Sequence, residues 1–153
     1  MKLISPAFEH EGFIPEMFSY EDGDCINPEL LLSGIPEKAM SLVLVMDDID
    51  ADNGSFFHWM VFDIPANTIR IEQDSIPGTQ AVNSAKRKGY TGPRPPQGPP
   101  HRYAFRIYAL DTVLGLPEGT HKDIVLKAME GHIIDKAELI GSYGKKVQEA
   151  VAV

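Results

Sequence analysis

The sequence predicts a mainly β protein with a few short peripheral helices, and three observations support this fold class. Thirteen glycines and 12 prolines in 153 residues are an excess, and they interrupt residues 1–40 too often for a long helix. Several runs rich in β-branched and aromatic residues have the length of strands. The one clear helical pattern comes late in the chain, so helices are additions to a strand-rich core.

Four segments carry strand patterns. Residues 41–46 (SLVLVM) form a continuous apolar run, typical of a strand covered on both faces. Residues 56–64 (FFHWMVFDI) predict a second core strand. Residues 102–110 and 136–143 alternate between apolar and polar positions, as strands with one inner face do. The predicted inner faces are Tyr103, Phe105, Ile107 and Ala109 in the first and Ala137, Leu139, Gly141 and Tyr143 in the second.

Two helices are predicted near the end of the chain. Thr120, with Asp123 three residues later, resembles a capping box, and an apolar stripe at helical spacing follows it. Gly131 then ends this helix. A short terminal helix is predicted from Gly144 onward.

Length and composition limit the class of protein. A chain of 153 residues predicts a single domain over residues 1–153. The net charge of -8 disfavours binding to nucleic acid or to an anionic membrane over the whole surface. Cys25 is the only cysteine, which excludes an internal disulfide. The longest apolar run, residues 42–46, is far too short to cross a bilayer, and no signal peptide is recognisable, so we expect a cytoplasmic protein.

The common catalytic motifs are absent from the sequence. There is no phosphate-binding Gly-Lys-Ser/Thr loop, no GxGxxG after a strand, no HExxH and no GxSxG. The usual nucleotide, zinc-protease and serine-hydrolase hypotheses therefore lose their sequence support. Three clusters of polar residues at strand ends remain.

The first cluster is acidic and follows the apolar strand directly. Asp47, Asp48 and Asp50 lie in the segment MDDIDA. Side chains at i and i+2 of an extended chain point the same way, so Asp48 and Asp50 could serve one site. The alternative is a solvated acidic turn.

The second cluster is His58, embedded in the aromatic strand. Taken alone, a histidine in such company is a hydrogen-bonded core residue. With a polar partner it would face a pocket and bind an anion or a carboxylic acid.

The third cluster is the segment 89–103, GYTGPRPPQGPPHRY. Prolines restrict the backbone and glycines allow it to approach a ligand closely, so the segment predicts a stiff pocket rim that places His101 at the entrance of a strand. The alternative is a polyproline II segment or a plain surface loop. The preceding basic run, residues 86–88, is predicted to be a solvated loop.

The order of these motifs resembles one known family. D-x-D-A, then H-W, then G-Y-x-G-P-x-P-P-x-G-x-P-H-R-Y, then Y-A-L-D is similar to the phosphatidylethanolamine-binding protein (PEBP) family. The likeness is closest to its prokaryotic YbhB/YbcL-type branch, which is Raf kinase inhibitor-like. Residues 5–8 (SPAF) and 128–132 (AMEGH) add to a likeness that covers nearly the whole chain. The resemblance implies a β-sandwich of two antiparallel sheets, with a small pocket for phosphate-like anions at one end.

The resemblance also implies site residues and a function. Members bind phospholipid headgroups or other phospho-ligands, and eukaryotic members modulate kinases and signalling. It brings no shared catalytic activity, and we expect no metal and no cofactor. The positions that match the family pocket are Asp48, Asp50, His58, Gly92, Pro95, His101 and Tyr103, with Tyr90 close by.

Two departures from the family pattern concern the rim. The usual D-P-D-A-P has Ile49 and Asp52 in place of its prolines, and the usual N-D-F-G becomes N-S-A-K at residues 83–86. We expect a reshaped rim in which Asp52 adds negative charge near the proposed anion site.

Three functions stay open from the sequence. The first is a binding module in which His58 and His101 contact the phosphate, the Gly92 region offers backbone donors, and Asp48 orients a histidine and raises its pKa. The second is a metal-dependent or acid/base hydrolase that uses the same Asp and His side chains. The third is a modulator that binds a protein partner through the proline-rich rim at Pro95. The ligand, the protein partner and whether a homodimer forms cannot be read from the residues.

Overall fold

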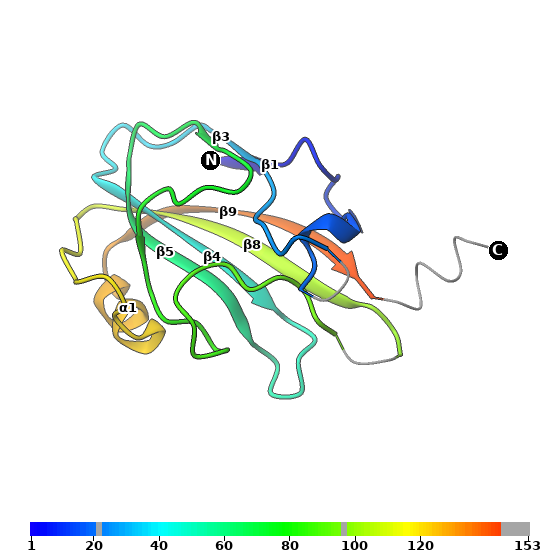
Figure 1. Ribbon diagram of the computed structural model, residues 1–153. Coiled ribbons are helices and arrows are strands. Elements are labelled where there is room, and N and C mark those ends of the chain that lie inside the picture. Colours follow the sequence, from blue (N-terminus) through cyan, green and yellow to red (C-terminus); the bar gives the residue numbers. More distant parts are fainter. Residues whose placement is uncertain (21–22, 96–97, 145–153) are drawn as a thin grey trace.

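The computed structural model describes residues 1–20, 23–95 and 98–144, and strands dominate it (Figure 1). The strands are β1 (Lys2–Ile4), β2 (Gly12–Phe13), β3 (Leu30–Ser33), β4 (Ser41–Asp48), β5 (Phe57–Pro65), β6 (Arg70–Ile71), β7 (Thr79–Gln80), β8 (His101–Leu110) and β9 (Ile133–Tyr143). In the described ranges, the helical structure is α1 (Lys122–Met129) and a single 3-10 turn, η1 (Glu16–Phe18). The predicted mainly β fold class is confirmed.

The strands form two sheets. The larger sheet has the order β2-β9-β8-β4-β5-β7, and all its pairs are antiparallel except β2 with β9. The smaller sheet has the order β1-β3-β6. Figure 1 shows the small sheet over one face of the large sheet, while α1 covers one end of the opposite face. This is the two-sheet sandwich that the family resemblance implied.

Strand β4 is central in the large sheet and buried on both faces. Leu44 and Met46 belong to the core between the two sheets, whereas Val43 and Val45 belong to the core beneath α1. All eight residues of β4 are buried. The predicted coverage on both faces is therefore confirmed, and the strand continues two residues beyond the predicted end.

The two alternating strands also have the predicted inner faces. In β8, Tyr103, Phe105 and Ile107 lie in the core between the sheets. In β9, Leu139 and Tyr143 lie in the same core, although the strand begins three residues earlier than predicted. Period-two alternation located these strands because each has one face against the small sheet.

The helix near residue 120 differs from the prediction at its first turn. The N-cap is His121, whose Nδ1 accepts a hydrogen bond of 3.2 Å from the Asp123 amide. The Thr120 hydroxyl instead donates to the Pro117 carbonyl at 2.6 Å, so the predicted capping box does not form. Gly131 follows the helix with a positive φ of 79°, as expected of a residue that ends a helix. The predicted terminal helix falls in residues 145–153, outside the described residues.

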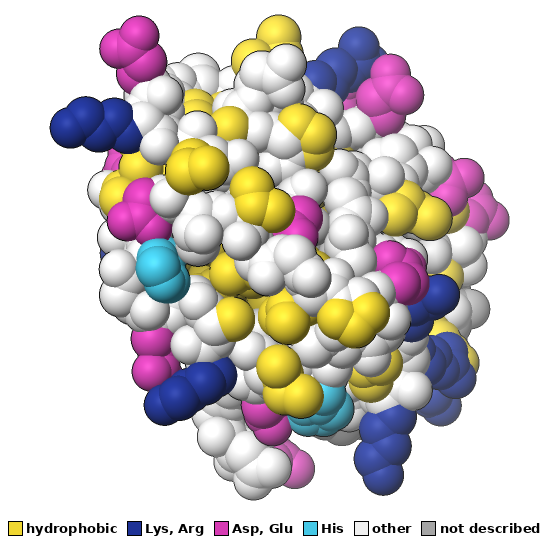
Figure 2. Space-filling model, turned by 90° about the vertical axis from the view of Figure 1, so that its left-hand side faces the viewer, with side chains coloured by type: hydrophobic (Ala, Val, Ile, Leu, Met, Phe, Trp, Pro, Cys, Tyr) yellow, Lys and Arg dark blue, Asp and Glu magenta, His cyan; other side chains and the backbone are white. Residues whose placement is uncertain are grey.

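The α1 end of the molecule exposes apolar side chains, which Figure 2 shows spread across that face with charged groups mainly around them. Met40, Val113, Ile124 and Ile133 are all more than two-fifths exposed there. Strand β4 begins at this end and runs to the opposite end, where its last residues meet the loops described next. In the described part of the chain, no helix is long and apolar enough to cross a membrane.

Candidate ligand cavity at the end of the large sheet

Strand pairing brings the three predicted polar clusters together. Asp48 is the last residue of β4, and its register partner in β8 is Tyr103, so His101 at the start of β8 lies beside it. His58 lies near the start of β5, which pairs with β4 on its other side. Asp48, His58 and His101 all line one cavity of about 520 Å³. Their predicted convergence is confirmed, although 53 residues separate the first from the last.

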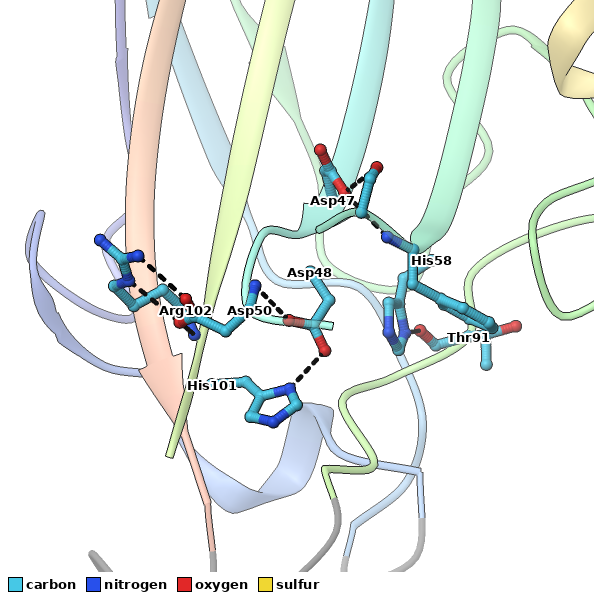
Figure 3. Close-up of polar contacts among 9 residues, drawn as sticks. Asp47, Asp48, Asp50, His58, Thr91, His101 and Arg102 are labelled. Carbon is cyan, nitrogen blue, oxygen red and sulfur yellow. Dashed lines mark hydrogen bonds and ion pairs between the residues drawn. The ribbon is translucent and has the colours of Figure 1, made fainter. Parts of the chain in front are cut away.

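Asp48 fixes the orientation of His101. Its Oδ2 lies 2.7 Å from the His101 Nδ1, as Figure 3 shows, and its Oδ1 accepts the Asp50 amide at 3.0 Å. A carboxylate can only accept, so Nδ1 carries the hydrogen and Nε2 is left for a ligand. The Asp48 side chain is 7% exposed and that of His101 is 17% exposed. The pair is thus a partly buried hydrogen bond whose free nitrogen is available at the cavity.

His58 is held by the loop on the other side of the cavity. Its Nδ1 lies 2.7 Å from the Thr91 carbonyl, which can only accept a hydrogen bond. Its ring packs edge-on against Tyr103 and Phe56, with ring centres 5.3 Å and 5.1 Å away. Burial lowers the pKa of His58, and the Thr91 carbonyl and the Asp48 charge offset this only in part. His58 therefore stays neutral and presents Nε2 as an acceptor.

Asn83 organises the loop that holds His58, and sequence reasoning missed it. Its Nδ2 lies 3.0 Å from the His58 carbonyl and 3.0 Å from the Thr91 hydroxyl, while its Oδ1 accepts the Arg87 amide at 3.1 Å. The residue is 1% exposed. An asparagine that follows a strand is common in turns, so only its burial distinguishes it from an ordinary turn residue.

Asp50 does not enter the cavity. It forms a two-pronged ion pair with Arg102, with contacts of 3.0 Å to Nε and 2.9 Å to Nη2, and also accepts the Arg102 amide at 2.8 Å. These hydrogen bonds lower the pKa of Asp50. The chain turns directly after Asp48, so the alternation of an extended strand does not continue to Asp50. The expectation that Asp48 and Asp50 serve one site is not met.

Tyr90 and Gly92 support the cavity from behind and do not line it. The Tyr90 hydroxyl donates to the Phe18 carbonyl at 2.9 Å. The Gly92 amide donates to the Cys25 Sγ at 3.3 Å, and a Cβ on Gly92 would lie 2.3 Å from the Phe18 oxygen. Gly92 is therefore required for close packing of two backbone segments. The expected backbone donors for a ligand are used inside the protein at this position.

Tyr103 and Pro95 complete the predicted set. Tyr103 is fully buried, and its ring supports the His58 ring. Burial, reinforced by the nearby Asp48 charge, raises the pKa of its hydroxyl far above the ordinary value. Pro95 lines the cavity as predicted.

The rim after β4 is tied down by Asp47. Its Oδ1 accepts from the Ser55 hydroxyl at 2.8 Å and from the Phe56 amide at 3.1 Å, so it closes the loop between β4 and β5. Its Oδ2 forms an ion pair of 3.0 Å with Arg106. Asp52, on this loop, lines the cavity and supplies the additional negative charge that the sequence predicted.

Two arginines that the sequence analysis did not select also line the cavity. The Arg87 and Arg94 guanidinium carbons lie 5.1 Å and 5.0 Å from the centre of the Tyr20 ring, and all three residues line the cavity. Arg87 belongs to the run of residues 86–88 that was predicted to be a solvated loop. The loop held by Asn83 turns the Arg87 side chain toward the cavity. No pattern in the sequence distinguishes Arg87 from its basic neighbours, Lys86 and Lys88.

Within the described residues, no group of three or more His, Cys, Asp and Glu side chains gathers as metal ligands would. The hydrolase hypothesis therefore gains no observation from this site and stays an untested prediction.

The fold is a two-sheet β-sandwich with a cavity at one end whose lining includes His58, His101 and Asp48. The model of the phosphatidylethanolamine-binding protein family matches residues 4–144. The chain belongs to this family.

Relatives and solved structures agree with this assignment. A UPF0098 protein from Methanothermobacter thermautotrophicus is 43% identical over 150 residues, covering 94% of this chain and 98% of the relative. The crystal structure of a PEBP homolog from Chlamydia trachomatis has a TM-score of 0.88 at 39% identity, covering 94% of this chain and 96% of that one. YbcL from Escherichia coli, described as a member of the mammalian PEBP family, has a TM-score of 0.86 at 24% identity, covers 93% of this chain and 96% of its own, and shows the fold alone.

Proposed function

We propose that the protein is a non-enzymatic binding protein for a small phosphorylated ligand, a phosphomonoester or a phospholipid headgroup. The observation that carries this proposal is the hydrogen bond of 2.7 Å between Asp48 and His101 at the wall of the cavity. It holds the His101 ring in one orientation before any ligand arrives, and preorganised contacts lose less entropy on binding.

The two histidines are complementary in their hydrogen bonding. Nε2 of His101 becomes a charged donor when the ring is protonated, which suits the oxygens of a phosphate group. His58 stays neutral and accepts, which suits the remaining P–OH of a monoprotonated phosphate. A phosphomonoester takes up this proton near pH 6. Lower pH therefore favours both the charged donor at Nε2 of His101 and the P–OH group from which His58 accepts.

Binding without turnover is supported by the hydroxyl groups at the cavity. The Ser55 hydroxyl donates to Asp47, and the Thr91 hydroxyl accepts from Asn83. The Thr91 hydroxyl accepts from an amide, and the carboxylate to which Ser55 donates is already held by the Phe56 amide and by Arg106, so no histidine activates either hydroxyl.

Calorimetric titration with glycerol 3-phosphate at pH 6.5 tests the proposal. We expect a dissociation constant in the micromolar to millimolar range, about 4 to 8 kcal/mol of binding free energy. The His101→Gln variant should weaken binding about tenfold or more. The chain offers a matched control, because His132 pairs with Asp111 at 2.8 Å on the surface, away from the cavity.

The His132→Gln variant should bind like the unmodified protein. Equal weakening in the two variants, or no heat of binding in the unmodified protein, would contradict the proposed site. Release of inorganic phosphate during the titration, followed by 31P NMR, would contradict the non-enzymatic part of the proposal.

The proposal includes a cytoplasmic location and no nucleic-acid partner, in keeping with the net charge of -8. A role as a signalling modulator would add a protein partner. Capture of one partner that is lost on changing Pro95, but kept on changing His58, would support that role.

A further inference from the structure

We propose that the outer edge of strand β9 pairs two copies of this chain into a symmetric dimer, in which Lys136 of each copy faces Glu138 of the other. The outer edge is the side of β9 that points away from β8. This inference goes beyond ligand binding and does not depend on it, because Lys136 and Glu138 do not line the cavity of His58 and His101.

The first observation is that only the last part of this edge is covered in the described chain. Strand β2 pairs with residues 141–142 of β9. Just before them, Ile140 donates to the His10 ring at 3.1 Å and accepts the Glu11 amide at 2.7 Å. The backbone groups of Ile140 therefore point to the outer edge.

Alternate residues of a strand direct their backbone groups to the same side, so Lys136 and Glu138 also direct theirs to the outer edge. Within residues 1–20, 23–95 and 98–144, the Glu138 amide, the Glu138 carbonyl and the Lys136 carbonyl have no hydrogen-bond partner there. Such an edge is a template for pairing with another strand.

The second observation is that the charges on this edge select one register. In an antiparallel pair, Lys136 can face Lys136, Glu138 or Ile140 of the second copy. The first register places two lysines opposite each other, and the third places Glu138 opposite Glu138. Only the second brings opposite charges together, and the symmetry of the pair forms this contact twice. Opposite charges in facing positions stabilise a strand pair, whereas like charges destabilise it.

The third observation is that the two side chains lie on one face and that the carboxylate is already held. Lys136 and Glu138 pair with Tyr108 and Arg106 of β8, and all four line a second cavity of about 450 Å³. The Arg106 Nε donates to the Glu138 Oε2 at 2.8 Å, and 44% of the Glu138 side chain stays exposed. Lys136 of the second copy would therefore meet a carboxylate that is fixed in position.

The pairing is short and has defined ends. Each Glu138 amide would donate to the Lys136 carbonyl of the other copy. The Lys136 amide donates to the Asp135 Oδ1 at 2.8 Å and would exchange this acceptor for the Glu138 carbonyl of the other copy. Ile134 would then meet the segment before β2, which already covers residue 140, so the pairing stops there. A contact of this size is weak and forms only at high protein concentration.

The dimer would keep both ligand cavities accessible. Its centre is Ala137, and Tyr143 at the end of β9 pairs with His101 at the cavity. The stretch 137–143 is about 20 Å long at about 3.3 Å per residue. Antiparallel pairing places the two His101 ends on opposite sides, about 40 Å apart, so the dimer would bind two ligands independently.

Sedimentation equilibrium of the complete chain at low salt tests the pairing. Between about 20 μM and about 1 mM protein, the average mass should rise from the 16.9 kDa of one chain toward twice that value. Lys136→Glu and Glu138→Lys should each weaken association about tenfold, because each places like charges opposite each other at two positions. Lys127→Glu makes the same charge change on α1, at a side chain that is 80% exposed, and should associate like the unmodified protein.

Mixing the two edge variants gives a result that general charge effects do not. An equimolar mixture of Lys136→Glu and Glu138→Lys restores both opposite-charge contacts between unlike copies. The mixture should therefore associate within about threefold of the unmodified protein, although each variant alone does not. Hydrogen exchange locates the contact, because the Glu138 amide should exchange more slowly at high than at low concentration. The Ile140 amide already has a partner and should not change.

Two outcomes would overturn the inference. One is an average mass that stays at that of one chain up to about 1 mM. The other is association that persists unchanged in both edge variants, since the contact would then lie elsewhere, for example at the apolar side chains of the α1 end. The proposed function is tested separately, because Lys136→Glu should bind glycerol 3-phosphate as the unmodified protein does. Loss of the dimer would leave that function standing.

Discussion

Asp47 and Asp48 are consecutive aspartates at the end of β4, yet the two faces of the strand give them opposite roles. Both are almost completely buried, at 4% and 5% exposure of the whole residue. Asp47 is satisfied by the Ser55 hydroxyl, the Phe56 amide and the permanent charge of Arg106. Asp48 holds His101, whose other ring nitrogen is available at the cavity. The partners of Asp47 are structural, so we call its side of the strand the closed face, whereas the Asp48 side faces the cavity.

The difference arises from the neighbouring strand β8 and not from the aspartates themselves. Residues opposite each other in an antiparallel pair share a face, and β8 pairs Arg106 with Val45 and Tyr103 with Asp48. Arg106, a fixed cation, therefore pairs with Asp47, whereas Asp48 contacts His101 at the start of β8. The comparison teaches that a buried carboxylate serves the fold where its partner is a fixed cation, and orients a side chain at the cavity where its partner is a histidine with a second ring nitrogen.

The largest expected effect is that of an unpaired charge on the closed face. Val43 lies on the same face as Asp47 and is fully buried beneath α1. Val43→Asp should lower the free energy of unfolding by about 4 kcal/mol or more, because the new carboxylate has no cation to meet it. Urea denaturation measures this, with Val43→Thr as an uncharged control of similar shape. Equal midpoints for the two variants would contradict the expected cost of burying a carboxylate without a cation.

Asp47→Asn removes the charge from the closed face and should cost about 2 to 3 kcal/mol of unfolding free energy. The value lies below that for a fully buried pair because Arg106 keeps Glu138 at 2.8 Å and is partly exposed. Affinity for glycerol 3-phosphate should change less in this variant than in Asp48→Asn. A larger loss of affinity in Asp47→Asn than in Asp48→Asn would contradict the different roles given to the two aspartates.

Asp48→Asn should affect binding more than stability. An asparagine amide can donate to Nδ1 of His101, which moves the imidazole hydrogen to Nε2 and exchanges the roles of the two nitrogens. Affinity for glycerol 3-phosphate should fall about tenfold at pH 6. In the unmodified protein we expect this affinity to rise as pH falls from 8 to 6, and in the variant this rise should be lost. Calorimetry at the two pH values measures this. A pH dependence equal to that of the unmodified protein would show that Asp48 does not orient His101.

The smallest expected effect is a pH dependence of stability from His58. Its pKa is lowered in the folded protein, so the unfolded chain binds the proton more tightly. Stability should therefore fall as pH drops below about 6.5, by at most about 1.4 kcal/mol per pH unit. The Asp50 carboxyl, whose pKa is also lowered, contributes only at much lower pH.

Urea denaturation at pH 7.5, 6.5 and 5.5 should give a shallower dependence in His58→Gln than in the unmodified protein. His132→Gln serves as the exposed control, and equal slopes for all three proteins would refute the neutral state of His58.

The long strands could be predicted from the sequence because their patterns reflect burial directly. The run at β4 is buried on both faces, and the alternation in β8 and β9 marks one inner face. The strands of two to four residues, such as β2 and β7, have no detectable period. Strands β2 and β7 form because the longer strands β9 and β5 present an edge to them.

The site was predicted in outline. The convergence of Asp48, His58 and His101 follows from the ends of strands that pair. The position of Asp50 outside the cavity could be predicted only with knowledge of the turn after Asp48. Arg87 could not be distinguished from its basic neighbours, because its direction is set by hydrogen bonds from Asn83. The position of Arg87 at the cavity depends on tertiary contacts, which a local sequence pattern does not contain.

Chemical-shift mapping by NMR tests most directly whether the Asp48 face binds the anion. Inorganic phosphate is titrated into the 15N-labelled protein at pH 6.5. The largest amide shifts should be those of His58, Thr91 and His101, and His101→Gln should remove them while the remaining spectrum is kept. Shifts confined to Arg106, Tyr108 and Lys136, which line a second cavity away from His58 and His101, would contradict the account.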